Sequence, residues 1–252
     1  MSSFGGGRQQ QTPLVSDGCG ATFPWLRSAL ASDCRVFELS PDDTETVLHT
    51  FEGGADGALP EGALIADNAG NLYGTTPKGG VHNRGTVFMV TPKVKEKVFD
   101  AFKRGNDGDY PHCTLILDKV GNLYGTTEKG GAANVGTVFK FAPDGTEAVF
   151  YAFKGGSDGA WPVGGLIADS AGNFYGTTNE DGGTGCGDVG CGTEFKLAPD
   201  GTETVHSLNY GSDGAEPWAA LTMDRADLKG ALFGTAPGGG AQTQGSIFSI
   251  KK

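Results

Sequence analysis

The sequence predicts an all-β fold, a five-bladed β-propeller of four-stranded antiparallel blades. The phrase LIADxxGNLYGTT at 64–76 returns as LILDKVGNLYGTT at 115–127 and LIADSAGNFYGTT at 166–178, and a degenerate copy occupies 221–236. A second phrase, GTVF or a close variant, follows each copy, and no segment between the phrases has helical periodicity. A repeat of about 50 residues that holds four short strands is typical of a propeller blade.

The third full copy shows why four strands are expected in each repeat. Residues 163–169 alternate into an apolar run and predict a strand, which a tight turn joins to a second strand at 173–178. A glycine-rich loop leads to a third strand at 192–197, and the turn phrase PDGT at 199–202 precedes a fourth at 203–208. We call these strands A to D, from the axis outward.

The N-terminal residues are predicted to form a degenerate blade. Each D strand ends nine residues before a proline, and Phe4 lies nine residues before Pro13 in the same way. Residues 13–51 are therefore predicted to be a blade with strand A near 14–17 and strand B near 21–25. The pairs that set this spacing are Phe51 and Pro60, Phe102 and Pro111, Phe153 and Pro162, and Leu208 and Pro217.

Ring closure is predicted from what the two ends of the chain lack. The last repeat supplies strands A to C only, and residues 1–7 resemble a lone D strand. If residues 2–6 pair with 245–250, the N-terminal strand closes the ring and removes an open sheet edge. The alternative is a four-bladed ring with residues 1–40 packed outside it. The prediction is one propeller domain over 1–252, with blades at about 13–51, 60–102, 111–153, 162–208, and 217–252 plus 1–7.

The 252-residue chain is acidic and rich in glycine. Its formal net charge is −11, and its 44 glycines are spread through turn phrases without a collagen period. Nucleic acid and anionic membrane surfaces require a basic patch, so neither is expected as a partner. The sequence has no apolar run long enough to insert in a membrane. The N-terminal residues also lack the apolar core of a signal peptide.

Five cysteines give an odd count. Cys186 and Cys191 lie in a loop, GTGCGDVGCGT, that is five residues longer than its counterparts, and we expect a disulfide there. A free thiol pair and a metal site are the alternatives, but two thiolates without a nearby histidine are half of a zinc site, so no metal is expected. Cys113 is expected to be reduced. Cys19 and Cys34 map to opposite faces and are expected not to bond each other.

The repeat phrases resemble those of the GloVer family, the tandem-repeat "choice-of-anchor" bacterial surface proteins. The resemblance covers nearly the whole chain except 1–33, and it implies secretion or surface display without an assigned activity. An extracellular or cell-surface location is therefore expected, and a disulfide would agree with it. The matching segments are 85–88, 136–139, the PDGTE turns at 143–147 and 199–203, SDG at 157–159 and 212–214, and the GNLYGTT strings.

Strand direction places the D–A and B–C loops on one face of the propeller, which we call the near face. Loops carry function when a rigid scaffold holds them. One aspartate recurs there before a glycine, and it could bind calcium or sugar hydroxyls or accept backbone N–H groups in its own turn. A second aspartate ends each A strand on the opposite, far face, where a hairpin-cap role is expected. The first set is Asp56, Asp107, Asp158 and Asp213, and the second is Asp67, Asp118, Asp169 and Asp224.

Aromatic residues also gather on the near face. Tyr110 and Trp161 precede repeat prolines, Trp218 follows one, and Trp25 falls near the same rim. Their rings could stack on sugars or could fill gaps between blades. The ligand-binding residues predicted from both patterns are Tyr110, Trp161, Trp218, Asp107, Asp158 and Asp213.

The residue after each repeat proline should start strand A near the axis, and it differs among the copies. Glu61 and His112 hold this position in neighbouring blades and could form an acid–base pair at a channel mouth, or could be unrelated variable residues. Paired carboxylates are not visible at equivalent inner positions, and GxSxG, P-loop and HExxH motifs are absent from the sequence. We therefore predict no catalytic residues and no cofactor.

These observations favour a non-catalytic binding module on a repeat propeller scaffold, with carbohydrate or another surface ligand as its partner. The alternative is a structural or assembly subunit that uses the propeller rim to contact other proteins. A propeller hydrolase or lyase is a third interpretation.

Overall fold

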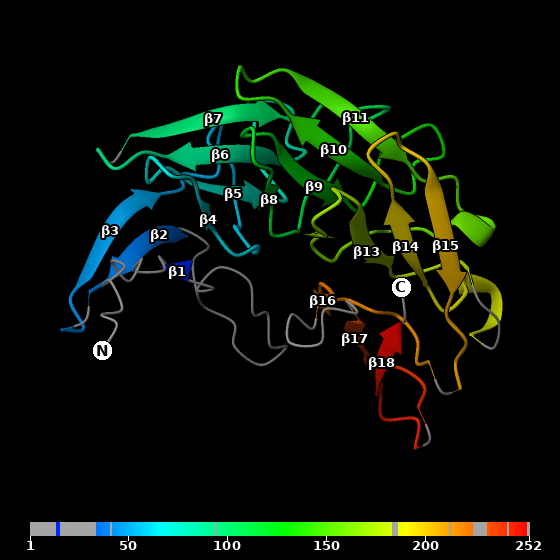
Figure 1. Cartoon of the computed structure of the whole chain (residues 1–252). Coiled ribbons are helices and arrows are strands. Elements are labelled where there is room, and N and C mark those ends of the chain that lie inside the picture. Colours follow the sequence, from blue (N-terminus) through cyan, green and yellow to red (C-terminus); the bar gives the residue numbers. More distant parts are fainter. Residues whose placement is uncertain are drawn as a thin grey trace, which may run out of the picture.

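The chain forms five antiparallel β-sheets that follow one another in sequence order. The computed structural model describes residues 14–15, 34–40, 42–93, 95–182, 186–211, 213–223, 231–240 and 242–250. Figure 1 shows the sheets arranged round an arc, from the blue first sheet to the red fifth. Within this described part, no helix has the length and hydropathy needed to cross a bilayer.

Three sheets have four strands and two have three among the described residues. The first sheet contains β1 (Leu14–Val15), β2 (Arg35–Leu39) and β3 (Glu45–Thr50); the second β4 (Ile65–Ala66), β5 (Leu72–Thr76), β6 (Thr86–Val90) and β7 (Glu96–Ala101). The third contains β8 (Ile116–Leu117), β9 (Leu123–Thr127), β10 (Thr137–Phe141) and β11 (Glu147–Ala152). The fourth contains β12 (Ile167–Ala168), β13 (Phe174–Thr178), β14 (Thr193–Leu197) and β15 (Glu203–Ser207); the fifth β16 (Thr222–Met223), β17 (Leu232–Ala236) and β18 (Ser246–Ile250).

The predicted A-B-C-D order is confirmed in the three four-stranded sheets. The A strands, however, are only two residues long, shorter than the predicted 163–169. Residues just before them bond to the neighbouring sheet instead: Thr75 donates its hydroxyl to the Cys113 carbonyl (2.9 Å), and Thr126 donates to the Gly164 carbonyl (3.0 Å). This segment therefore joins consecutive sheets rather than extending strand A.

The predicted position of strand A in the first sheet is wrong. β1 pairs directly with β2, with Leu14 opposite Phe37, which is the place that strand B takes in the other sheets, as where Gly74 lies opposite Phe88. The repeat phrase is degenerate in this segment, so spacing alone does not distinguish strand A from strand B. The predicted B strand near 21–25 and the closing strand at 1–7 lie outside the described residues.

The glycine of one repeat phrase and the phenylalanine of the other pack against each other on paired strands. A Cβ atom on Gly74 would lie 2.6 Å from the ring of Phe88, and one on Gly125 would lie 2.5 Å from the ring of Phe139. The glycine of YGTT thus leaves room for the phenylalanine of GTVF on the paired strand, and a larger residue would displace the ring.

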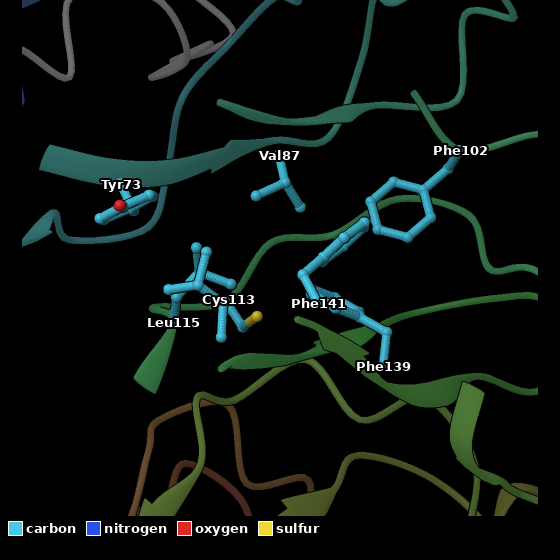
Figure 2. Close-up of a cluster of buried hydrophobic side chains, with 8 residues drawn as sticks. Tyr73, Val87, Phe102, Cys113, Leu115, Phe139 and Phe141 are labelled. Carbon is cyan, nitrogen blue, oxygen red and sulfur yellow. The ribbon is translucent and has the colours of Figure 1, made fainter. Parts of the chain in front are cut away.

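The apolar core lies between consecutive sheets. Figure 2 shows Tyr73 and Val87 of the second sheet facing Leu115, Phe139 and Phe141 of the third. Similar buried clusters join the first sheet to the second and the third to the fourth. Each sheet therefore depends on its neighbour for burial, as expected of a repeat that cannot form a core alone.

The A–B hairpins are closed by the aspartates predicted to cap them. Asp67 accepts hydrogen bonds from the backbone N–H groups of Ala69 (2.8 Å) and Asn71 (2.9 Å), and from the Tyr73 hydroxyl (3.0 Å). The same contacts recur at Asp118 and Asp169. The phrase DxxGNLY is thus a hairpin cap in these copies, and Asp224 lies outside the described residues.

The cysteines follow the predicted pattern in part. Cys186 and Cys191 form a disulfide with an S–S distance of 1.97 Å, and Cys113 is free and buried. Cys34 is disulfide-bonded, whereas the expectation was that Cys19 and Cys34 do not bond each other. That expectation rested on the repeat phase of the degenerate N-terminal segment, and Cys19 lies outside the described residues.

Candidate functional site

The near-face aromatics are held by backbone hydrogen bonds between consecutive sheets. Tyr110 donates its N–H to the Arg84 carbonyl (3.1 Å) and accepts from the Glu128 N–H (3.0 Å). Trp161 is held in the same way, with its carbonyl accepting from the Asn179 N–H (3.0 Å). Both have positive φ angles, 56° and 58°, which are uncommon for bulky residues. Leu59 and Glu216 share this conformation at the equivalent positions, so it belongs to the scaffold.

Tyr110 and Trp161 flank a lysine. The ammonium group of Lys129 lies 5.3 Å from the Tyr110 ring centroid and 5.8 Å from that of Trp161. Both rings are half-buried, whereas Trp218 is 60% exposed. The structure therefore brings Tyr110 and Trp161 to one cation.

A series of charged side chains that contact one another lies beside the row formed by Tyr110, Lys129 and Trp161. His112 bonds through Nδ1 to Glu61 Oε2 (2.8 Å) and through Nε2 to Glu128 Oε2 (3.0 Å), and Glu128 Oε1 contacts Lys129 Nζ (3.1 Å). The Tyr110 ring is nearly parallel to the imidazole, with the centroids 6.4 Å apart. The acid–base pair considered for Glu61 and His112 is therefore a real contact, and Glu128 extends it.

The two carboxylates fix the protonation of His112. Burial alone would lower the pKa of His112, but hydrogen bonds to Glu128 and Glu61 outweigh burial and raise it to about 9. The same contacts lower the pKa values of Glu61 and Glu128. At neutral pH both ring nitrogens carry protons and donate, so the imidazole is not available as a base.

A buried ion pair supports the loop that carries Tyr110. Asp109 is 1% exposed and contacts Arg84 at 3.1 Å and Arg104 at 4.0 Å. Burial raises the pKa of Asp109, and the two arginines oppose that shift. Ala58, Ala160 and Ala215 occupy the equivalent position before the other repeat prolines and Gln11 the one before Pro13, so this pair is particular to the loop beside Tyr110.

The recurring aspartates of the D–A loops cap their own turns. Asp107 accepts from the Lys103 N–H (2.7 Å), Asp158 accepts from the Lys154 N–H (2.6 Å), and Asp213 accepts from the Asn209 side-chain amide (3.2 Å). These contacts support the turn interpretation given above, and a ligand-binding role for the three aspartates stays a prediction.

The same aspartates also take part in contacts between sheets. Asp100, Asp107 and Glu147 bring one carboxylate oxygen each within 4.8 Å of one another, a group that could hold a metal ion. At the next junction Tyr151 stands where Asp100 does, and its hydroxyl donates to Asp158 (2.8 Å) and to Glu203.

A separate groove of about 500 Å³ lies on the far face between the third and fourth sheets. Its apolar lining includes Tyr124, Phe150 and Phe174, while Asp118 and Asp169 at its rim already cap hairpins. These two carboxylates are therefore already engaged by the turns that they close.

The functional residues that sequence reasoning missed are Glu128, Lys129, Arg84 and Asp109. Their signal was divergence among copies: Glu128 stands where the others have proline or asparagine, and Asp109 stands where they have alanine. A comparison of aligned copies at each loop position would have selected them.

Comparison with protein families and solved structures shows what this chain is similar to. The profile of the Gloeobacter/Verrucomicrobia repeat matches residues 11–189. The chain belongs to this repeat family. Its recurring phrases are thus family features, and the GloVer resemblance is confirmed. No curated protein matches the chain.

Several solved structures share the fold at low sequence identity. A candidate gluconolactonase is 16% identical, with a TM-score of 0.51 over 86% of this chain and 70% of its own. Luciferin-regenerating enzyme is 12% identical, with a TM-score of 0.53 over 87% of this chain and 72% of its own. The extracellular domain of a candidate one-component system from B. thetaiotaomicron is 13% identical, with a TM-score of 0.54 over 85% of this chain but 24% of its own.

These neighbours support the fold and carry no assignment of activity. They are β-propellers, so the chain has a propeller-like all-β architecture. At such low identity, likeness extends to the fold alone.

Proposed function

We propose that this chain is a non-catalytic binding module whose near face takes carbohydrate. The observation that carries this proposal is the row of Tyr110, Lys129 and Trp161 beside the hydrogen-bonded chain of Glu61, His112 and Glu128. Aromatic faces next to oriented polar groups suit sugar rings, which present an apolar face and a rim of hydroxyls. Trp218, Asp107, Asp158 and Asp213 would extend the same surface.

The charged state of His112 and the disulfide-bonded cysteines support a binding role outside the cytoplasm. The imidazolium of His112 is already saturated by two carboxylates, which favours binding over proton transfer. Two observations, the Cys186–Cys191 disulfide and a bonded Cys34, favour an oxidising, extracellular or cell-surface location. A structural or assembly role, with a protein surface as the partner, is the outcome if no sugar binds.

The finer architecture is a further part of the proposal: one domain of five blades, closed by residues 1–7. The first sheet supports a count of five, because β1, β2 and β3 pair as a sheet of their own. Deleting residues 1–7 should expose the edge of β18. The expected loss of about 1–2 kcal/mol would lower the melting temperature by about 2–8 °C, as scanning calorimetry would measure. An unchanged melting temperature would count against closure by this strand.

Replacing Trp161 with alanine is expected to weaken carbohydrate binding by about tenfold or more, because one stacked ring contributes roughly 1.4 kcal/mol. The fold should survive, since the ring is half-buried on a loop and the backbone bonds of Trp161 remain. The measurement is a glycan-array screen of the wild type, followed by titration calorimetry of both proteins with the best glycan.

The control is Val120→Ala, which changes an exposed residue of a far-face hairpin. This variant should bind like the wild type. If Trp161→Ala unfolds the protein and no glycan binds the wild type, the ring fills a gap between blades and the structural role replaces the binding role.

A further inference from the structure

The fourth sheet contains three buried polar side chains that lack hydrogen-bond partners among the described residues. Thr177 is 1% exposed, Asn179 5% and Glu194 6%. The unpartnered atoms are Thr177 Oγ1, Asn179 Nδ2 and Glu194 Oε2. Buried polar atoms in native proteins almost always bond to protein, water or ligand, so a water molecule or a ligand group is expected to bond these atoms.

The three residues are neighbours by strand register. Thr177 lies directly opposite Glu194 on the paired strands β13 and β14, so both side chains point to the same face of the sheet. Asn179 comes two residues after Thr177, directly beyond the end of β13. Thr177 and Glu194 therefore face each other across the paired strands, and Asn179 follows at the end of the same strand.

The earlier sheets fill this region differently. Val87 and Val138 stand where Glu194 does, and both are fully buried. In those sheets the equivalent threonines, Thr75 and Thr126, donate their hydroxyls to carbonyls of the next sheet. The fourth sheet alone among these three replaces an apolar contact by a carboxyl group and leaves its threonine unpaired.

Thr75 and Thr126 each bond to the next sheet, so the equivalent Thr177 marks a region between the fourth and fifth sheets. A Cβ atom on Gly164 would lie 3.0 Å from the Ala219 carbonyl oxygen and 3.3 Å from Thr177 Oγ1. The Ala219 carbonyl, which would complete the repeat pattern, and Thr177 Oγ1 thus both border Gly164, but no hydrogen bond joins them.

The region adjoins the near face. The Asn179 N–H donates to the Trp161 carbonyl (3.0 Å), and Trp218, which is 60% exposed, directly precedes Ala219. The backbone of Trp161 thus contacts Asn179, and Trp218 adjoins the residue whose carbonyl borders Gly164 near Thr177.

We propose that Thr177, Asn179 and Glu194 form a buried subsite that binds the hydroxymethyl arm of a sugar held on the near face. This inference rests on the proposed carbohydrate-binding function and deepens it. Because the side chains are almost fully buried, the proposed occupant is a slender arm ending in a hydroxyl and not a sugar ring. A hydroxyl both donates and accepts, and it matches an amide donor, a threonine hydroxyl and a carboxyl group.

The test compares methyl β-glucoside, which has the hydroxymethyl arm, with methyl β-xyloside, which lacks it. Calorimetric titration should show the glucoside binding wild type about tenfold more tightly, because a site built to bond a hydroxyl disfavours the analogue without it. Glu194→Val, which restores the residue of the earlier sheets, should make the two affinities equal, and Glu194→Gln provides a second variant of similar shape. In isotope-labelled wild-type protein, the carboxyl carbon resonance of Glu194 should move with the glucoside and not with the xyloside.

The outcomes separate the subsite from the near-face function. If Trp161→Ala weakens glucoside binding but Glu194→Val leaves the preference unchanged, the near-face function stands and the subsite is overturned. If Glu194→Val removes the preference while Trp161→Ala has no effect, the subsite stands and the aromatic surface is overturned. If the Glu194 resonance does not move with glucoside up to its solubility, water alone satisfies these atoms and the subsite is rejected.

Discussion

Replacing Glu194 with valine is expected to stabilise the protein by about 3 kcal/mol near pH 8 and to remove the part of its pH dependence that Glu194 contributes. Burial raises the pKa of Glu194 from 4.5 to about 7. A carboxyl group whose pKa rises on folding favours the folded state while it is protonated. That contribution is fully present below the unfolded value and is lost as the pH rises through the folded value.

Valine is chosen because it occupies the same position, fully buried, in the second and third sheets. Urea denaturation of both proteins, near pH 5 and near pH 8, measures the free energies of unfolding. The stabilising effect should be large near pH 8 and small near pH 5, because the wild-type carboxyl group is neutral at the lower pH. Equal effects at both values would mean that packing, and not ionisation, sets the difference.

Glu194→Gln separates charge from polarity. Glutamine removes the ionisation but keeps buried polar atoms, so it should recover only part of the stability that valine gives near pH 8. If glutamine destabilises the protein at both pH values, the carboxyl group of Glu194 has a bonding partner in the folded protein. A residue that lowers stability without a partner is often retained for function, which agrees with the proposed subsite.

The strands were predictable because local physical constraints determine the residues of the repeat phrases. Gly74 and Phe88 require each other across paired strands, and Asp67 binds the turn that follows it. Each constraint repeats with the chain, so a single sequence shows it several times. The place of Leu14 was not predictable, because the first repeat has lost the hairpin phrase and its spacing fits more than one strand.

The candidate site was harder to predict because it lies where the copies differ. The aromatic positions Tyr110 and Trp161 could be placed on the near face from repeat phase alone. The contact of His112 with Glu128 could not, since it depends on how a loop of the third sheet folds back over its own inner strand. Divergence marks such residues, but only a structure shows which of them meet.

Replacing Asp100 with tyrosine is expected to raise the melting temperature by about 2–8 °C at neutral pH, for a gain of roughly 1–2 kcal/mol in this size of protein. At this junction Asp100, Asp107 and Glu147 face one another. Burial, and then contact with Asp100 and Asp107, raises the pKa of Glu147 above its usual range. The contribution of Glu147 to the stability of the folded protein is therefore lost as the pH rises above the unfolded pKa of 4.5.

Tyrosine is the residue that the next junction uses at this position. There the Tyr151 hydroxyl donates to Asp158 (2.8 Å) and to Glu203, so a neutral donor takes the place of a third carboxylate. Asp100→Tyr should reproduce that arrangement with Asp107 and Glu147, and the reciprocal Tyr151→Asp should lower the melting temperature. Scanning calorimetry measures the melting temperatures of both variants. If Asp100→Tyr lowers the melting temperature while Tyr151→Asp leaves it unchanged, the two junctions do not share one design, and like-charge repulsion does not limit stability at the first of them.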